Sequence, residues 1–191
     1  MEDIADAKIR NILDMAYTFS AMPRVFEKAS KTRIVQRLHT AFKEFTTVAD
    51  QTDFDNTHSA FCEWFVVDIK TAERQKGRVI AKPSGPTSYG QAAKLFDVAS
   101  KVYVYYCHLP DRDTAARLLP LLHGAVDTAI MKYLKSRYPE CGINASAIID
   151  IDRISYTSLQ RLIARNIKED FNEVPLHPVQ YDDIMWYRLN R

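Results

Sequence analysis

Residues 88–109 read SYGQAAKLFDVASKVYVYYCHL, and this stretch decides the fold class. Its apolar residues recur at helical spacing and cover most of the helix circumference. Only a narrow polar stripe remains, made of Lys94, Asp97, Lys101 and His108. Ser88 and Gln91 fit a Ser-x-x-Gln capping box, which satisfies two unpaired amides at a helix start. The stretch therefore predicts a helix from Ser88 to Leu109 through the middle of the core.

Helical spacing recurs on both sides of this stretch. Apolar stripes predict helices over residues 4–19 and 32–49, and a third helix that ends near Arg74. Residues 75–87 contain glycine and proline and exclude a regular helix, although residues 78–81 are suited to a short strand. Later helices are expected to start at Asp111, with Asp127 as N-cap, at Ser146 or Asp150, and after Pro178.

The composition agrees with a helical protein, because the chain has only five glycines in 191 residues and 47% hydrophobic residues. We expect an all-α fold, a compact multi-helix orthogonal bundle with at most one short hairpin. We expect residues 1–191 to form a single domain. The alternative arrangement has two lobes, with a cleft between residues 32–82 and residues 88–140.

The formal net charge is +2 at pH 7, which is too small to indicate a nucleic-acid partner by itself. The densest basic cluster consists of Lys70, Arg74, Lys76, Arg78 and Lys82, and such a run is usually a solvated surface. The three cysteines contain no CxxC pair and predict neither a disulfide framework nor a zinc knuckle. No stretch reaches the roughly 18 apolar residues of a membrane span. We expect a cytoplasmic protein without a membrane partner.

Two lysines in a core helix need an explanation, because removing an ammonium group from water is costly. Asp97 lies three residues after Lys94 and four before Lys101. One interpretation is that Asp97 pairs with both lysines along a solvent-facing stripe. The other is that Lys94 is a reactive amine whose pKa is lowered by burial or by a neighbouring cation such as Lys101.

The second interpretation rests on a combination of motifs. A capped loop leads into a helix that carries Gly90 and Lys94, and a His-Gly-Ala-Val approach leads to the N-cap Asp127. This combination resembles the helix-hairpin-helix DNA glycosylases, most nearly the archaeal 8-oxoguanine DNA glycosylase branch. It is also similar to bacterial anti-phage glycosylases, including one that removes a glucosylated hydroxymethylcytosine. By this resemblance, Lys94 is the nucleophile and Asp127 is its partner.

The implied activity is excision of a modified base from double-stranded DNA, with or without later strand cleavage. Breaking the N-glycosidic bond develops positive charge on the deoxyribose, which the carboxylate of Asp127 would stabilise. The amine of Lys94 would attack the sugar carbon and form a Schiff base. Neither a cofactor nor a metal is expected, because the acidic pairs at 150/152 and 182/183 have no histidine at ligand spacing.

A flipped nucleotide needs phosphate contacts and a pocket for the base. The backbone amides at a helix start can bind phosphate. The expected DNA-binding residues are Ser88, Tyr89, Gly90, Gln91 and Lys101. Candidates for the base pocket are Trp64, Trp186 and His123.

Two other functions remain open. Arg33 with His39, and Arg117 with His123, match the Arg-x(4 to 6)-His spacing of the all-helical HEPN ribonucleases. Alternatively, the chain is a non-catalytic helical subunit that binds nucleic acid or protein through the basic residues between 70 and 82. A ribonuclease would lose activity when Arg33 or His39 is changed, and a glycosylase would lose activity when Lys94 is changed.

Overall fold

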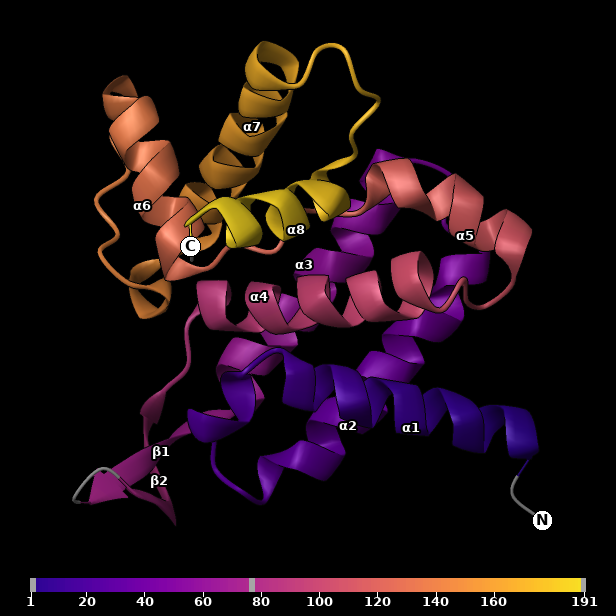
Figure 1. The fold of residues 1–191 in the computed structure, drawn as a ribbon. Coiled ribbons are helices and arrows are strands. Elements are labelled where there is room, and N and C mark those ends of the chain that lie inside the picture. The colour runs from indigo at the N-terminus through magenta and orange to yellow at the C-terminus, as the bar shows by residue number, and fades with distance from the viewer. Residues whose placement is uncertain (1–2, 76–77, 190–191) are drawn as a thin grey trace.

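The computed structural model describes residues 3–75 and 78–189, without the side chains of residues 74–83. Within this part of the chain, eight α-helices account for most of the fold (Figure 1): α1 (Ile4–Phe19), α2 (Ser30–Lys43), α3 (Gln51–Asp68), α4 (Tyr89–Ser100), α5 (Arg112–Leu118), α6 (Thr128–Arg137), α7 (Arg153–Asp170) and α8 (Pro178–Leu189). Single 3₁₀ turns lie at η1 (Met22–Arg24), η2 (Glu44–Thr46), η4 (Leu119–Leu121), η5 (Pro139–Cys141) and η6 (Ile148–Asp150). The expected all-α class is confirmed.

The expected short hairpin is present as two antiparallel strands, β1 (Lys70–Gln75) and β2 (Arg78–Pro86), at one end of the molecule (Figure 1). The prediction that the third helix ends near Arg74 is wrong. The backbone turns extended at Ile69, and the following residues pair with β2 instead of continuing the helix. Of the basic cluster, only the side chain of Lys70 belongs to the described part, so a role for that cluster stays a prediction.

Helix α4 lies in the middle of the molecule, with α1 on one side and α8 on the other (Figure 1). It contacts α1, α2, α3 and α7, and nearly all of its side chains are buried. The predicted capping box is confirmed, since Ser88 Oγ accepts from the Gln91 amide and Gln91 Oε1 accepts from the Ser88 amide. The helix continues as a π-helical turn, η3 (Lys101–Tyr106), and ends close to the predicted Leu109. Such turns widen the helix and are frequent at functional sites.

The buried hydrophobic residues form one contiguous cluster from Ile12 in α1 to Met185 in α8. Phenylalanine rings from α2, α3 and α4 meet at its centre, where Phe42 and Phe96 pack edge to face with ring centroids 5.4 Å apart. No helix in the described residues is both long and apolar enough to cross a bilayer.

Candidate functional site

One cavity, with a volume of about 460 Å³, lies where α4, the start of α6 and α8 meet, beside the end of α1. Charged side chains from three separate parts of the chain line it: Lys94, Lys101, Asp127, Asp182 and Asp183. We call it the Lys94 cavity. The structure thus brings the two residues of the sequence hypothesis, 33 positions apart, into one cavity.

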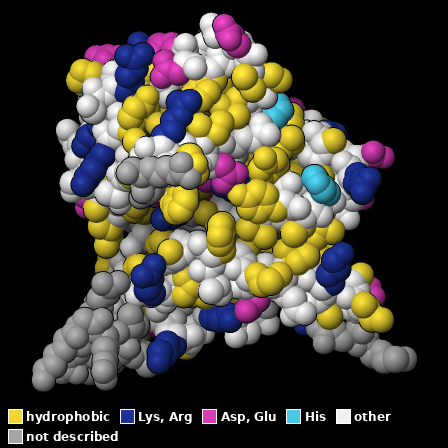
Figure 2. Space-filling view, viewed as in Figure 1, with side chains coloured by type: hydrophobic (Ala, Val, Ile, Leu, Met, Phe, Trp, Pro, Cys, Tyr) yellow, Lys and Arg dark blue, Asp and Glu magenta, His cyan; other side chains and the backbone are white. Residues whose placement is uncertain are grey.

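The rest of the Lys94 cavity is mainly apolar, with walls from Phe19, Val98, Ala125, Ile130 and Trp186. Trp186 is 61% exposed and Phe19 is 66% exposed, so large rings stand at the surface beside the charged groups. In Figure 2, which is viewed as Figure 1, hydrophobic side chains lie on both sides of the boundary where α8 meets α4, and an acidic side chain lies between them. An apolar cavity with a few polar groups is the usual form of a small-molecule site.

Asp127 is positioned by the local structure of its own segment. As predicted, it is the N-cap of α6, and its Oδ1 accepts from the Ile130 amide at 2.8 Å. The extended chain before it passes close to α8, because a Cβ added at Gly124 would lie 2.7 Å from the carbonyl oxygen of Pro178. Glycine at this position therefore lets the segment approach α8 and carry Asp127 to the cavity.

Lys94 is partly buried on the central helix, in surroundings that favour the neutral amine. Burial lowers the pKa of its ammonium group below the usual value, and the charge of Asp127 opposes this shift. Arg24 is the nearby cation whose charge lowers the pKa further. A lysine with a lowered pKa has more of the unprotonated amine that can act as a nucleophile.

Lys101 does not act as that neighbouring cation, because two carboxylates hold it. Its Nζ is 2.9 Å from Asp182 Oδ2 and also contacts Asp183 Oδ1. The structure also overturns the interpretation that Asp97 pairs with both lysines along a solvent-facing stripe. Asp97 is buried and accepts hydrogen bonds from Tyr156 rather than from a lysine, so the simple pairing interpretation is wrong.

Asp182, which lines the Lys94 cavity, has an unused hydrogen-bond acceptor. Its Oδ2 accepts from Lys101, but its Oδ1 is buried and has no hydrogen-bond partner. Burial raises the pKa of this carboxyl to about 7, although Lys101 opposes the shift. A buried polar atom without a partner costs stability.

A second cavity, of about 450 Å³, lies between α3, α7 and the chain after η4. Polar side chains on its wall include Gln51, Asp55, His58, His123, Tyr156 and Gln160. We call it the Tyr156 cavity. Sequence analysis did not predict it, because its residues come from positions about 100 apart and show no local motif.

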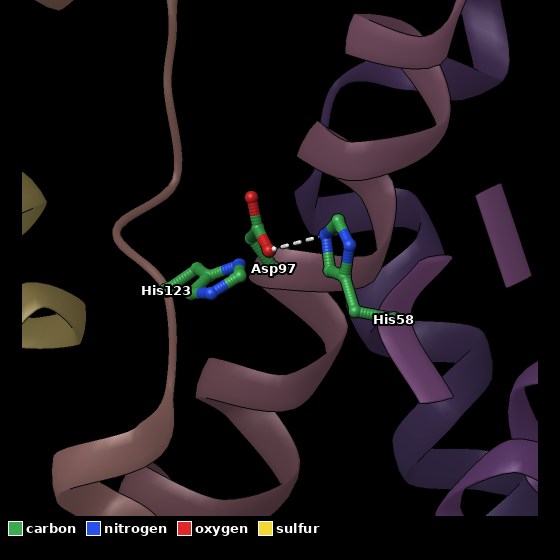
Figure 3. A group of neighbouring side chains, drawn as sticks. All are labelled: His58, Asp97 and His123. Atoms are coloured by element: carbon green, nitrogen blue, oxygen red, sulfur yellow. Dashed lines mark ion pairs between the residues drawn. The ribbon is translucent and has the colours of Figure 1, made fainter. Parts of the chain in front are cut away.

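At the inner end of the Tyr156 cavity, the hydroxyl of Tyr156 lies among three side chains that no sequence motif had linked. It donates to Asp97, 2.9 Å from Oδ2, and lies 3.1 Å from His58 Nε2 and 2.9 Å from His123 Nδ1. Figure 3 shows His58 and Asp97 on neighbouring helices, with His123 facing them from an extended segment. Asp97 Oδ1 is 3.2 Å from His58 Nε2.

Burial shifts the ionisation of this group strongly. It lowers the pKa of His58 to about 3 and raises the pKa of Asp97 to about 7. His58 is therefore a neutral imidazole at physiological pH, and it does not supply a positive charge to Asp97.

The backbone amides of the predicted phosphate-binding turn already donate hydrogen bonds to other groups of the protein. The amides of Ser88 and Gln91 are used in the capping box, and the amide of Gly90 donates to the Ile151 carbonyl at 2.9 Å. Tyr89 lines the Tyr156 cavity and lies 3.4 Å from Ser59 Oγ. Phosphate binding by this turn stays a prediction, and it would compete with these internal bonds.

The three candidates for the base pocket lie in different places. Trp186 lines the Lys94 cavity, whereas His123 lines the Tyr156 cavity. Trp64 packs against Phe61, and Arg37 lies over its ring at 5.6 Å from the centroid. Trp186 is therefore the candidate that shares a cavity with Lys94.

The residues of the ribonuclease alternative are held by separate partners. Arg33 donates to Glu27 at 2.8 Å, whereas His39 Nε2 lies 3.3 Å from Asp6 Oδ1. Arg117 donates to the backbone carbonyl of Thr46 and does not line the cavity that contains His123. Neither pair faces a common cavity in the described residues.

The sequence had located Lys94, Asp127 and Trp186, but it gave no signal for the orphan oxygen of Asp182 or for the group around Tyr156. Both arise where distant segments pack together. No protein-family model matches this chain, and no curated protein or solved structure is significantly similar to it.

Proposed function

We propose that this chain is a DNA glycosylase that excises a modified base from double-stranded DNA, with the Lys94 cavity as its active site and a fold of the helix-hairpin-helix glycosylase type. The observation that carries the proposal is that Lys94 in the middle of α4 and Asp127 at the start of α6 line one largely apolar cavity. A nucleophile and its carboxylate partner must reach the same sugar, so they have to share a cavity.

The charges of the cavity support the two roles. Asp127 would stabilise the positive charge that develops on the deoxyribose as the base leaves. Because burial favours the neutral amine of Lys94, this side chain would attack the anomeric carbon of the sugar. The carbon–nitrogen bond to the base breaks as the lysine–carbon bond forms, and the base leaves with a proton from solvent.

The remaining walls support a flipped base as ligand. Trp186 and Phe19 offer aromatic surfaces beside the reactive pair, and a flipped base needs such surfaces for stacking. Rotation of the Asp182 side chain would present its unpaired Oδ1 as an acceptor to an N–H group on the base. We therefore expect substrates with an N–H group on the edge that enters the cavity.

The test is incubation with DNA duplexes that each carry one modified base, including 8-oxoguanine and glucosylated hydroxymethylcytosine, scored for abasic sites. We expect excision from at least one duplex by the wild-type protein, and loss of that excision in Lys94→Met and Asp127→Asn. Lys132→Met is the matched control, because Lys132 is an exposed lysine on α6, and this variant should keep full activity. Excision that survives in both cavity variants would refute the assignment of this site.

A further inference from the structure

The polar group at the inner end of the Tyr156 cavity takes no part in the proposed excision of a base. We propose that His58, Asp97 and His123 bind a divalent transition-metal ion of the zinc class, with the Tyr156 oxygen as fourth ligand. This site would be separate from the Lys94 cavity.

The positions of the donor atoms fit such an ion. One ligand atom from each of His58, Asp97 and His123 lies within 4.8 Å of the other two. The Tyr156 oxygen is 2.9–3.1 Å from the same three side chains. Bonds of about 2.0–2.1 Å in a tetrahedral zinc site place neighbouring ligand atoms about 3.3 Å apart. Small side-chain rotations would therefore complete the coordination.

The donor set also fits the zinc class better than calcium or magnesium. Two imidazole nitrogens and a carboxylate are typical ligands of zinc and neighbouring transition metals, and the phenol oxygen of Tyr156 would be a less common fourth ligand. Calcium and magnesium prefer sites built only from oxygen ligands.

The hydroxyl of Tyr156 lies between two side chains whose lone pairs could coordinate an ion. Asp55 Oδ1 lies 3.0 Å from His123 Nε2, so this nitrogen carries the proton of the neutral ring and Nδ1 is an acceptor. The single hydroxyl proton of Tyr156 then has two acceptors, Asp97 and His123 Nδ1. In a metal site, His123 Nδ1 and the Asp97 carboxylate would both coordinate the ion, and Tyr156 would bind it through its oxygen.

Charge supports the same conclusion. In the described residues, the ion-pair partner of Asp97 is His58, and neither lysine nor arginine pairs with this buried carboxylate. An isolated buried charge is unfavourable unless it is paired or coordinates a metal. A divalent cation would stabilise the ionised form of Asp97.

The contact between Asp55 and His123 has the form of an outer-shell interaction. Metal-binding histidines usually donate their second ring N–H to a carboxylate, which fixes the ring orientation. Here Asp55 is at the cavity rim and His123 faces inward. His58, His123 and Tyr156 all line the Tyr156 cavity, so an ion can reach the donors from solvent.

Binding would join α3, α4, α7 and the extended segment that leads from His123 to Asp127. The ion would replace the hydroxyl proton of Tyr156, which would leave to solvent. A site with four protein ligands has no open position, so we expect it to stabilise the fold rather than to perform catalysis.

The test uses metal-free protein with Cys107→Ser, because the exposed thiol of Cys107 is a competing ligand. Zinc sulfate is titrated calorimetrically in two buffers of different ionisation enthalpy, and cobalt chloride is titrated by visible absorption. We expect one ion per chain, proton release, and the intense absorption of tetrahedral cobalt. A thermal midpoint that rises with zinc would agree with the role in stability.

Asp97→Asn and His123→Gln should each weaken zinc binding at least about 10-fold, and Asp55→Asn should weaken it about 10-fold through the outer shell. His39→Gln is the matched control, because His39 also lies beside a carboxylate but has no second histidine. Circular dichroism checks that each variant is folded. No zinc uptake by the wild-type fold, or equal uptake by His123→Gln, would overturn the proposal.

Discussion

Replacing Asp127 with asparagine should separate base excision from Schiff-base formation. Asparagine caps helices about as well as aspartate, so α6 should start at the same residue and stability should change by only a few tenths of a kcal/mol. The loss is the negative charge. At about 4 Å and an effective dielectric constant of about 20, a carboxylate stabilises a unit positive charge by about 4 kcal/mol. Excision should therefore slow by about 10³-fold.

The same variant should still react with DNA that already has an abasic site, because no glycosidic bond remains to be broken. The charge of Asp127 raises the pKa of Lys94, so its removal lowers that pKa further. The neutral amine reacts, and trapping rises as pH passes upward through the pKa of Lys94. The midpoint of the pH profile should consequently move to lower pH in Asp127→Asn.

Both effects are measured on one set of proteins, by release of the base from modified duplexes and by borohydride trapping on abasic DNA. Asp111→Asn is the matched control, since Asp111 is also a helix N-cap and accepts from the Thr114 amide at 2.9 Å, but it is exposed and lies outside the Lys94 cavity. A pH midpoint that stays fixed or moves upward in Asp127→Asn would show that the two side chains do not interact as described.

Three further predictions concern stability. Lys94→Met should leave the free energy of unfolding unchanged or raise it by about 1 kcal/mol, because an apolar side chain replaces a buried ammonium group; thermal melts measure this, and a clear loss would contradict it. Lys101→Met should cost about 3 kcal/mol in urea unfolding at pH 7 and less at pH 5, because the Asp182 carboxyl, whose pKa burial raises to about 7, is protonated there; an equal loss at both pH values would be inconsistent. The raised pKa of Asp182 means that the folded state holds its proton more tightly than the unfolded state, so its contribution to stability falls as pH rises from about 4 to about 7. Asp182→Asn should remove this fall. The melting temperature of the variant relative to wild type should therefore increase across that window, and the corresponding change in the free energy of unfolding has an upper limit of about 4 kcal/mol.

Local patterns in the sequence predicted the central helix and its caps, because these depend on neighbouring residues. Ser88 and Gln91 form the capping box, and Asp127 caps α6 through the Ile130 amide. The end of α3 could not be predicted in the same way. Its apolar spacing continues past Asp68, but pairing with β2 turns the following residues into a strand.

The candidate sites differ in the same way: one could be predicted from local patterns, and the other depends on long-range packing. Lys94 and Asp127 were found because a recognisable local pattern surrounds each: Lys94 follows the capping box of α4 by a few residues, and Asp127 is the N-cap of α6. The partners of Asp97 were not, since His58 and Tyr156 are 98 positions apart and meet only when α3 and α7 both pack against α4. A buried aspartate and an exposed one look alike in a helical pattern until the neighbouring helices are placed.

The most direct test of the proposed active site is to locate the lysine that forms the covalent bond to DNA. The wild-type protein is trapped with borohydride on duplex DNA with an abasic site, digested, and analysed by mass spectrometry. We expect the modified peptide to contain Lys94, and we expect Lys94→Met to give no adduct while Lys132→Met gives the normal amount. An adduct on another lysine or on the N-terminal amine, or none with the folded wild-type protein, would contradict the role of Lys94 as nucleophile.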